Sequence, residues 1–213
     1  EVLEPPQVPR LYFWAMQADM AGSGGRAGGA HLGLQWHPQH PGSTAVNWGG
    51  YRSSGGELHG SGSALQSATG NPNTRDYAWT DATPYRLRIE RVPAANVPGG
   101  LSAWRGSVQD MSSGALTVVR ELFMAGDRIV GATMWSEVFA RCDDPTVTVR
   151  WSAPVVHLAD RDLEVGALSV NYQTHLDGGC ANTDSSVDDV GAVQRTAVPR
   201  ATPQGARLLL PPC

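Results

Sequence analysis

The sequence predicts an all-β protein, an antiparallel β-sandwich of jelly-roll or concanavalin-like type with little helix. Glycine and proline are abundant, with 25 and 15 of the 213 residues, and only 17% of the residues are charged. This composition suits short strands joined by tight turns. Several segments alternate apolar and polar residues with the period of two that is typical of strands. A chain of this length can bury one substantial core, so we expect a single domain over residues 1–213.

The chain begins with a proline-rich segment, and we expect residues 1–9 to be an extended lead-in because proline fixes φ and removes a backbone donor. Residues 11–20 alternate as a long strand does. Residues 21–29 are glycine-rich, and we interpret them as a connector that is too flexible to belong to a strand.

Residues 28–51 contain the clearest hairpin pattern. In its first strand Leu32 and Leu34 point to one face, whereas His31 and Gln35 point to the other. A His-Pro-Gln-His-Pro-Gly turn leads to a second short strand that ends in Gly-Gly. The pattern predicts a sheet with an apolar core face and a polar outer face.

Residues 52–73 are polar and glycine-rich but do not open a helix, so the pattern does not predict a phosphate loop. Residues 85–92 alternate clearly, with arginines on the polar side. Further strands are predicted at residues 101–111, 116–124, 129–139, 147–151, 154–158 and 165–172. Residues 181–213 are interpreted as an irregular tail with a possible closing strand at residues 207–210.

Charge and hydropathy exclude two classes of partner. All sixteen basic residues are arginine and the net charge is −4, which disfavours a nucleic acid, because that partner requires clustered basic residues. No run approaches the roughly 20 apolar residues that cross a bilayer, so we expect no membrane insertion. The oligomeric state stays open.

The three cysteines suggest an oxidising compartment. Cys142 and Cys180 lie in loop-like contexts, and we predict a disulfide between them. Cys213 could be a free thiol, an intermolecular partner or the mate of either of the others. The chain begins with Glu, as a mature secreted chain without its signal peptide would, so we expect a secreted or cell-surface location.

The residue types on the predicted polar faces favour glycan recognition. Sugars are held by flat aromatic rings and by polar side chains that form paired hydrogen bonds. Candidate ligand-binding residues are Gln17, His31, Gln35, Asn47, Trp135 and Glu137.

An enzyme, either a polysaccharide lyase or a glycoside hydrolase, is the alternative interpretation. Glu137 is a carboxylate between aromatic residues on a predicted strand, and Tyr172 and His175 supply the residue types of a lyase base. The sequence nominates no second carboxylate as a partner for Glu137. A purely structural cell-surface protein is the third interpretation.

Metal binding receives little support from the spacing of ligand types. His37 and His40 are the candidates for a transition metal, but they flank a proline and no cysteine or carboxylate stands at ligand spacing. We therefore predict no cofactor, and leave calcium open because several carboxylates fall in predicted loops. These are Asp143, Asp144, Asp184, Asp188 and Asp189.

Several short motifs occur in a characteristic order. They are Gly-Gly-Ala-His-Leu-Gly-Leu-Gln at residues 28–35, Asn-Trp-Gly-Gly at residues 47–50, Gly-Ser-Gly-Ser-Ala-Leu-Gln at residues 60–66, Tyr-Ala-Trp at residues 77–79, Tyr-Arg-Leu-Arg at residues 85–88, Trp-Arg-Gly at residues 104–106 and Trp-Ser-Glu-Val-Phe at residues 135–139. Over about residues 10–140 this order resembles an extracellular bacterial domain-of-unknown-function family, number 3472. The chain departs from that family in having Asn-Trp-Gly-Gly where Ser-x-Trp-Asp is commoner. The resemblance implies a secreted β-sandwich that is often found with carbohydrate-active modules, and it implies no catalytic residues.

Overall fold

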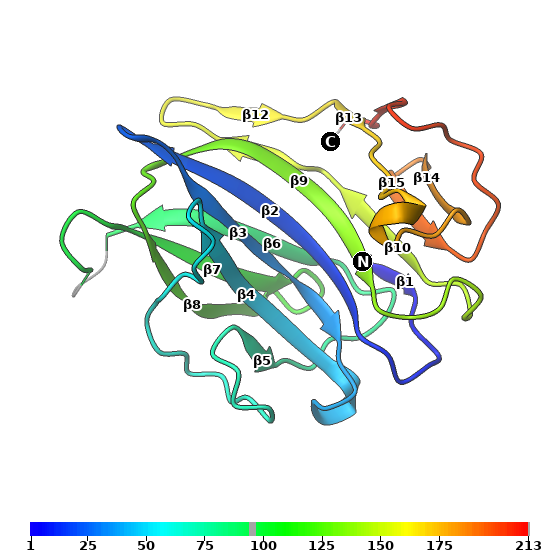
Figure 1. Ribbon diagram of the computed structural model, residues 1–213, viewed down its shortest axis with the longest axis horizontal. Helices are drawn as coiled ribbons and strands as arrows, with labels where there is room; N and C mark the ends of the chain where they lie inside the picture. Colours follow the sequence, from blue (N-terminus) through cyan, green and yellow to red (C-terminus); the bar gives the residue numbers. More distant parts are fainter. Residues whose placement is uncertain (94–96, 213) are drawn as a thin grey trace. The chain divides into compact units, whose positions relative to one another are not determined.

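Figure 1 shows the computed structural model, which describes residues 1–93 and 97–212. The prediction of an all-β, antiparallel fold is confirmed, because the described residues form strands and only two short 3₁₀ turns, η1 (Pro41–Ser43) and η2 (His175–Asp177). The jelly-roll subtype stays a prediction. The chain divides into two compact units, which we describe separately. Unit 2 is Pro9–Phe139, and unit 1 combines Glu1–Val8 with the chain from Ala140 onward. The expectation of a single domain stays a prediction.

Unit 2 contains two antiparallel sheets. The five-stranded sheet has the spatial order β5 (Thr74–Asp76), β4 (Thr44–Arg52), β3 (Gly25–Trp36), β2 (Tyr12–Gly22) and β9 (Arg128–Val138). The three-stranded sheet has the order β6 (Tyr85–Val92), β7 (Ser102–Asp110) and β8 (Leu116–Met124). The predicted strands at residues 11–20, 85–92, 101–111, 116–124 and 129–139 all exist, with shifts of at most a few residues at their ends.

The core of unit 2 is built from apolar side chains that alternate along these strands. Leu32 and Leu34 are buried, as the period-two pattern of β3 predicts. Trp48 of β4 is fully buried and its ring lies against Gly106 of β7, where an added Cβ would come within 2.6 Å of the indole. This close approach of an indole and a glycine joins the two sheets.

The predicted connector at residues 21–29 is wrong, because this segment belongs to one long hairpin. Strands β2 and β3 are paired along their whole length, from Tyr12 opposite Trp36 to Gly22 opposite Gly25, with one bulge next to Met20. Gly25 has a φ of +97°, which a side chain would disfavour at this turn. The glycines in this segment were interpreted as a sign of flexibility. They lie in paired strands instead, because the hydrogen bonds between strands are formed by the backbone and do not require side chains.

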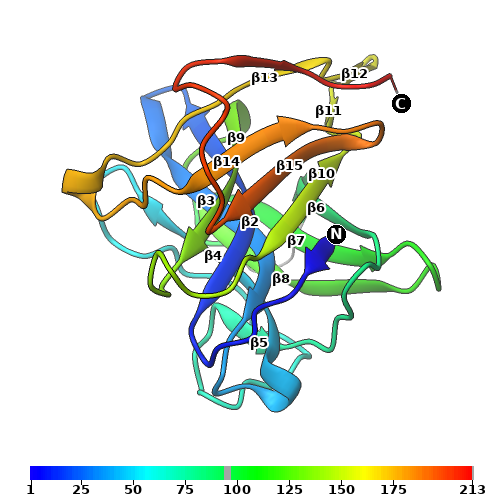
Figure 2. The same cartoon turned by 90° about the vertical axis from the view of Figure 1, so that its right-hand side faces the viewer.

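Unit 1 contains a four-stranded sheet and two small antiparallel pairs of strands (Figure 2). The sheet has the order β1 (Val2–Glu4), β10 (Thr148–Ser152), β15 (Gly191–Thr196) and β14 (Thr183–Val187). One pair is the hairpin of β11 (Val155–His157) with β12 (Asp162–Glu164). The other pairs β13 (Ala167–Ser169) with β16 (Arg207–Leu209), which are distant in the chain. The lead-in therefore contains a strand, and the predicted irregular tail contains β14 and β15. Their polar sequences lack the apolar alternation by which strands are usually detected.

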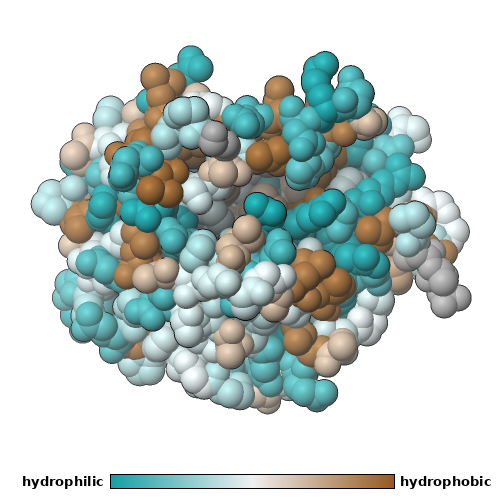
Figure 3. Space-filling model, turned by 180° about the vertical axis from the view of Figure 1, so that it is seen from behind, coloured by the Kyte–Doolittle hydropathy of each residue, from teal (hydrophilic) through white to brown (hydrophobic). Residues whose placement is uncertain are grey.

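The disulfide between Cys142 and Cys180 is confirmed, with a Cα–Cα distance of 5.5 Å. Arg150 of β10 also forms ion pairs with Glu1 and Asp188, so side-chain bonds tie the two chain segments of unit 1 together. Cys213 lies outside the described residues. Among residues 1–93 and 97–212, no helix could span a membrane. Figure 3 colours the surface from the side opposite to Figure 1, and hydrophilic and hydrophobic residues are interspersed over it.

Candidate functional site

The strand register of unit 2 places all six predicted ligand-binding residues on one face of the five-stranded sheet, which we call the polar face. They are Gln17, His31, Gln35, Asn47, Trp135 and Glu137. Gln35 on β3 and Glu137 on β9 both lie opposite Phe13 of β2, and His31 lies opposite Gln17. Because strand residues alternate between faces, these side chains all project to the same side as Phe13.

Four rings on the polar face form an aromatic cluster, consisting of Phe13, His31, Tyr51 and Trp135. The ring of Phe13 packs edge-on against Trp135 at 5.1 Å and against His31 at 5.6 Å between centroids. His31 also contacts Trp135 at 5.8 Å and Tyr51 at 6.4 Å. The Tyr51 residue is 51% exposed, so its ring is the part of the cluster most open to water.

Among the four rings, His31 has a strongly shifted pKa. Burial lowers the pKa of its imidazole from 6.5 to about 4, because the surrounding rings exclude the water that would stabilise the cation. Within the described residues no hydrogen bond or ion pair to its ring offsets this loss. His31 is therefore neutral at pH 7, and its nitrogens are one donor and one acceptor.

A cavity of about 240 Å³ lies beside the cluster, entirely within unit 2. Its walls include Gln17, Arg26, His31, Tyr51 and Arg52. At its edge, Asp19 accepts hydrogen bonds from Arg26 at 3.1 Å and from Gln17 at 3.3 Å. The cavity thus offers a ring, an imidazole, an amide and two guanidinium groups to a ligand.

Two amide side chains on the polar face are buried, and the oxygen of each accepts no hydrogen bond from a described residue. Gln35 is 6% exposed and Asn47 8% exposed. Asn47 donates to Thr74 at 2.8 Å, but neither Asn47 Oδ1 nor Gln35 Oε1 has a donor in the described part of the chain. A buried oxygen without a donor costs free energy, so these two amides reduce the stability of the fold.

Glu137 has a carboxyl group with a raised pKa, and the other two carboxylates on the polar face, Asp19 and Asp76, lie far from it. Although the residue is exposed, partial burial of its carboxyl raises its pKa above the usual range. Asp19 lies six residues along β2 from the position opposite Glu137, about 20 Å at strand rise, and Asp76 lies four strands away, about 19 Å. Glycosidases need two carboxyl groups within about 10 Å.

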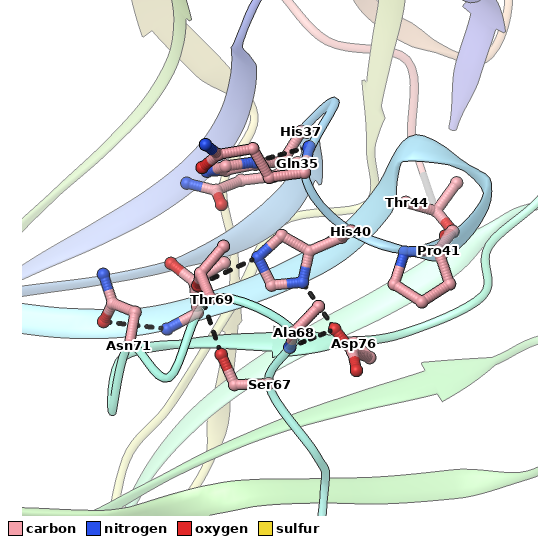
Figure 4. Close-up of polar contacts among 12 residues, drawn as sticks. Gln35, His37, His40, Pro41, Thr44, Ser67, Ala68, Thr69, Asn71 and Asp76 are labelled. Carbon is pink, nitrogen blue, oxygen red and sulfur yellow. Dashed lines mark hydrogen bonds and ion pairs between the residues drawn. The ribbon is translucent and has the colours of Figure 1, made fainter.

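His40, a candidate metal ligand, instead belongs to a hydrogen-bonded cluster in the turn after β3. Figure 4 shows its ring between Thr69 and Asp76. His40 is 4% exposed, with Nδ1 2.5 Å from the Asp76 carboxylate and Nε2 3.4 Å from the Thr69 hydroxyl. The backbone N–H of Ala68, followed in importance by His40, holds the pKa of Asp76 below its ordinary value.

His37 packs edge-on against His40 at 4.7 Å, and its pKa is lowered by burial and by the neighbouring imidazole. Among the described residues no group of three or more His, Cys, Asp or Glu could hold a metal ion.

The other catalytic candidates, Tyr172 and His175, belong to unit 1 and bond within it. The Tyr172 hydroxyl accepts the N–H of Ser185, and the Arg200 guanidinium lies 3.8 Å from the centre of the Tyr172 ring. His175 is exposed in η2. Neither residue lies on a strand, although the sequence suggested alternation there.

The carboxylates considered for calcium are also bonded within unit 1. Asp143 pairs with the Arg141 side chain and Asp188 with Arg150, while Asp184 accepts two backbone N–H groups. Asp184 lies in β14 rather than in a loop. Asp144 accepts the Arg141 N–H, and Asp189 is exposed.

Sequence reasoning did not identify Phe13, Asp19, Arg26 or Tyr51 as part of this site. Tyr51 lies two residues beyond Gly49 in the same alternation as Asn47, so extending the second strand past Gly49-Gly50 would have placed it on the polar face. Arg26 and Asp19 were hidden because residues 21–29 were interpreted as a connector.

Comparisons with known proteins identify no family for this chain. No family model matches it, and no curated protein matches its sequence. Among solved structures, it is similar to aspergilloglutamic peptidase from Aspergillus niger, with 11% sequence identity, a TM-score of 0.44, and coverage of 88% of this chain and 99% of that chain. A similarity at this level supports no conclusion about activity. The resemblance to the domain-of-unknown-function family stays a prediction.

Proposed function

We propose that this chain is a glycan-recognition protein that binds its ligand on the polar face, at the cavity beside the aromatic cluster. The observation that carries the proposal is the combination of an exposed ring, Tyr51, with a neutral imidazole, His31, in the wall of that cavity. An apolar ring surface and uncharged hydrogen-bonding groups match the two sides of a sugar, its C–H faces and its hydroxyls.

The amide of Gln17 in the cavity wall supports the same ligand class, because an amide can both donate to and accept from sugar hydroxyls. The confirmed disulfide is compatible with a secreted or cell-surface protein, which would meet extracellular polysaccharides. We retain the resemblance to the extracellular bacterial family as part of this proposal. A glycoside hydrolase has less support, because Asp19 and Asp76, the other carboxylates on the polar face, lie too far from Glu137. A lyase has less support because its candidate base residues, Tyr172 and His175, are not on the polar face but in unit 1.

Binding of the wild-type chain to an array of neutral and acidic oligosaccharides tests the proposal. We expect Tyr51→Ala and His31→Ala to weaken binding at least about tenfold, which corresponds to about 1.4 kcal/mol. Gln109→Ala in β7 is the matched control, because Gln109 lies on the other sheet and, within the part of the chain that the structure describes, its side chain forms a hydrogen bond only to the Gly114 carbonyl. Circular dichroism checks that each variant is folded.

Equal glycan affinity of the two site variants and the control would show that the polar face is not the glycan-binding site. Release of new reducing ends, or of the ultraviolet-absorbing product of uronate elimination, would establish an enzyme in place of a binding protein.

A further inference from the structure

Two arginines, one from each sheet of unit 2, face the space between the two sheets. This space lies on the side of the five-stranded sheet opposite to the polar face. Arg120 of β8 is 6% exposed, and Arg75 of β5 is half-buried with its Nε fully covered. Burial, followed by the positive charge of Arg75, lowers the pKa of Arg120. Within the described residues neither guanidinium forms an ion pair within 4 Å. Two like charges are therefore placed together without a salt bridge.

Three buried N–H donors belong to residues of this region and have no acceptor among the described residues. They are the Nε atoms of Arg75 and Arg120 and the indole Nε1 of Trp48. Arg75 lies opposite Val46 and so shares a sheet face with Trp48, two residues along β4. The Trp48 ring lies on Gly106, and Gly106 is the strand neighbour of Arg120.

The neighbouring acceptors do not complete the site. Asn73 Oδ1 accepts one N–H from Arg120 Nη2 at 2.6 Å, which leaves Nε unpaired. The carboxylate of Glu57 raises the pKa of Arg120, but Glu57 is exposed and forms no ion pair with a described residue. Asp76 follows Arg75 in the chain, and its carboxylate is bound to His40 and Ala68.

We propose that Arg75, Arg120 and the indole N–H of Trp48 form a binding site for a small oxygen anion, a free carboxylate or an inorganic oxyanion. Guanidinium groups bind such anions through charge-assisted hydrogen bonds, which are roughly twice as strong as neutral ones. One bound anion would accept the three unpaired donors and offset the repulsion between the arginines. The site is independent of the proposed function, since it uses the opposite face of the sheet.

The thermal unfolding midpoint of the full chain tests the site. It is measured at constant ionic strength while sodium acetate or sodium sulfate replaces sodium fluoride. We expect a saturable rise of the midpoint, because an anion that binds only the folded state stabilises it. Arg75→Gln should abolish the saturable part. Arg86→Gln, which changes an exposed arginine of β6 away from both sites, should leave it unchanged. Acetate and sulfate as separate arms distinguish a carboxylate from an inorganic oxyanion.

A second measurement does not depend on any variant. Crystals soaked in sodium bromide should show an anomalous peak between the two guanidinium groups. An equal midpoint rise in wild type and Arg75→Gln, together with water alone at that position, would overturn the proposal. A response seen only in Glu57→Gln would also overturn it, because the chain's own carboxylate would then be the occupant.

Discussion

Two histidines of the β3–β4 hairpin show how the same side chain acquires different roles. His40 is buried with a carboxylate on one nitrogen and a hydroxyl near the other. His31 is largely buried among rings and has no polar partner in the described part of the chain. A buried group with all its partners stabilises the fold, whereas a group desolvated without partners is available to a ligand. We therefore interpret His40 as a structural residue and His31 as a residue of the proposed ligand site.

Gly33→Ala should damage both histidine regions at once and has the largest expected effect. Gly33 lies between the His31 and Gln35 positions of β3, and an added Cβ would come within 2.0 Å of the Trp14 carbonyl oxygen in β2. Backbone atoms cannot move away cheaply, so we expect a loss of about 4 kcal/mol in the free energy of unfolding. Urea denaturation measures the loss. Gly24→Ala is the control, since nothing lies within 4 Å of the added atom, and an equal effect there would contradict the steric argument.

Acid should destabilise the protein through His31. Its pKa is about 4 when folded and 6.5 when exposed, so the unfolded chain takes up a proton first as pH falls. The stability that neutral His31 supports is complete above pH 6.5 and is lost between pH 6.5 and 4, by up to about 3 kcal/mol. His31→Phe keeps a ring but cannot titrate, so its free energy of unfolding should vary less over this range. Parallel pH curves for the two proteins would show that His31 is not desolvated.

Asp76→Ala should remove the partner of His40 and cost about 2 kcal/mol, because a buried imidazole nitrogen would be left unsatisfied. The folded pKa of Asp76 is lowered, so its contribution is present above pH 3.8 and is lost as pH falls through the folded value. Unfolding free energies of wild type and variant should therefore differ at pH 7 and converge in strong acid. A constant difference down to pH 2 would mean that the carboxylate charge is not involved.

Arg26→Ala has the smallest expected effect on stability. The Arg26 side chain is 68% exposed, and its pair with Asp19 is screened by water, so stability should change by less than about 0.5 kcal/mol. Glycan affinity should nevertheless fall, because Arg26 lines the cavity. Thermal unfolding and the oligosaccharide array separate the two effects. A large loss of stability would show that Arg26 supports the fold rather than the ligand site.

The period-two pattern was sufficient to predict most of unit 2. Leu32 and Leu34 alternate with His31 and Gln35 so regularly that both faces of β3 could be assigned, and six polar-face residues follow from the same rule. The pattern could not predict that Gln35 is buried, because burial depends on what lies over the face rather than on the strand itself. Sequence also gave no sign that His40 would bond to Asp76, which is brought near by a long loop.

Unit 1 was harder to predict for a physical reason. Its strands β14 and β15 are rich in Ser, Asp, Gln and Arg, and are held by backbone ladders and by side-chain bonds such as Arg195 to Ser186. Local apolar alternation carries no signal for such strands. Cysteine context succeeded where hydropathy failed, because a disulfide between loops needs no strand pattern.

The pairing of β1 with β10 has a consequence for synthesis. Val2 lies opposite Val149, so β1 has no partner until β10 has been synthesised. Unit 2 is continuous in sequence and can assemble during translation, whereas unit 1 must wait for its last segments. We therefore expect β1 to need protection from premature association during synthesis, and translation products that stall after Phe139 to contain a folded unit 2 and a β1 segment without its β10 partner.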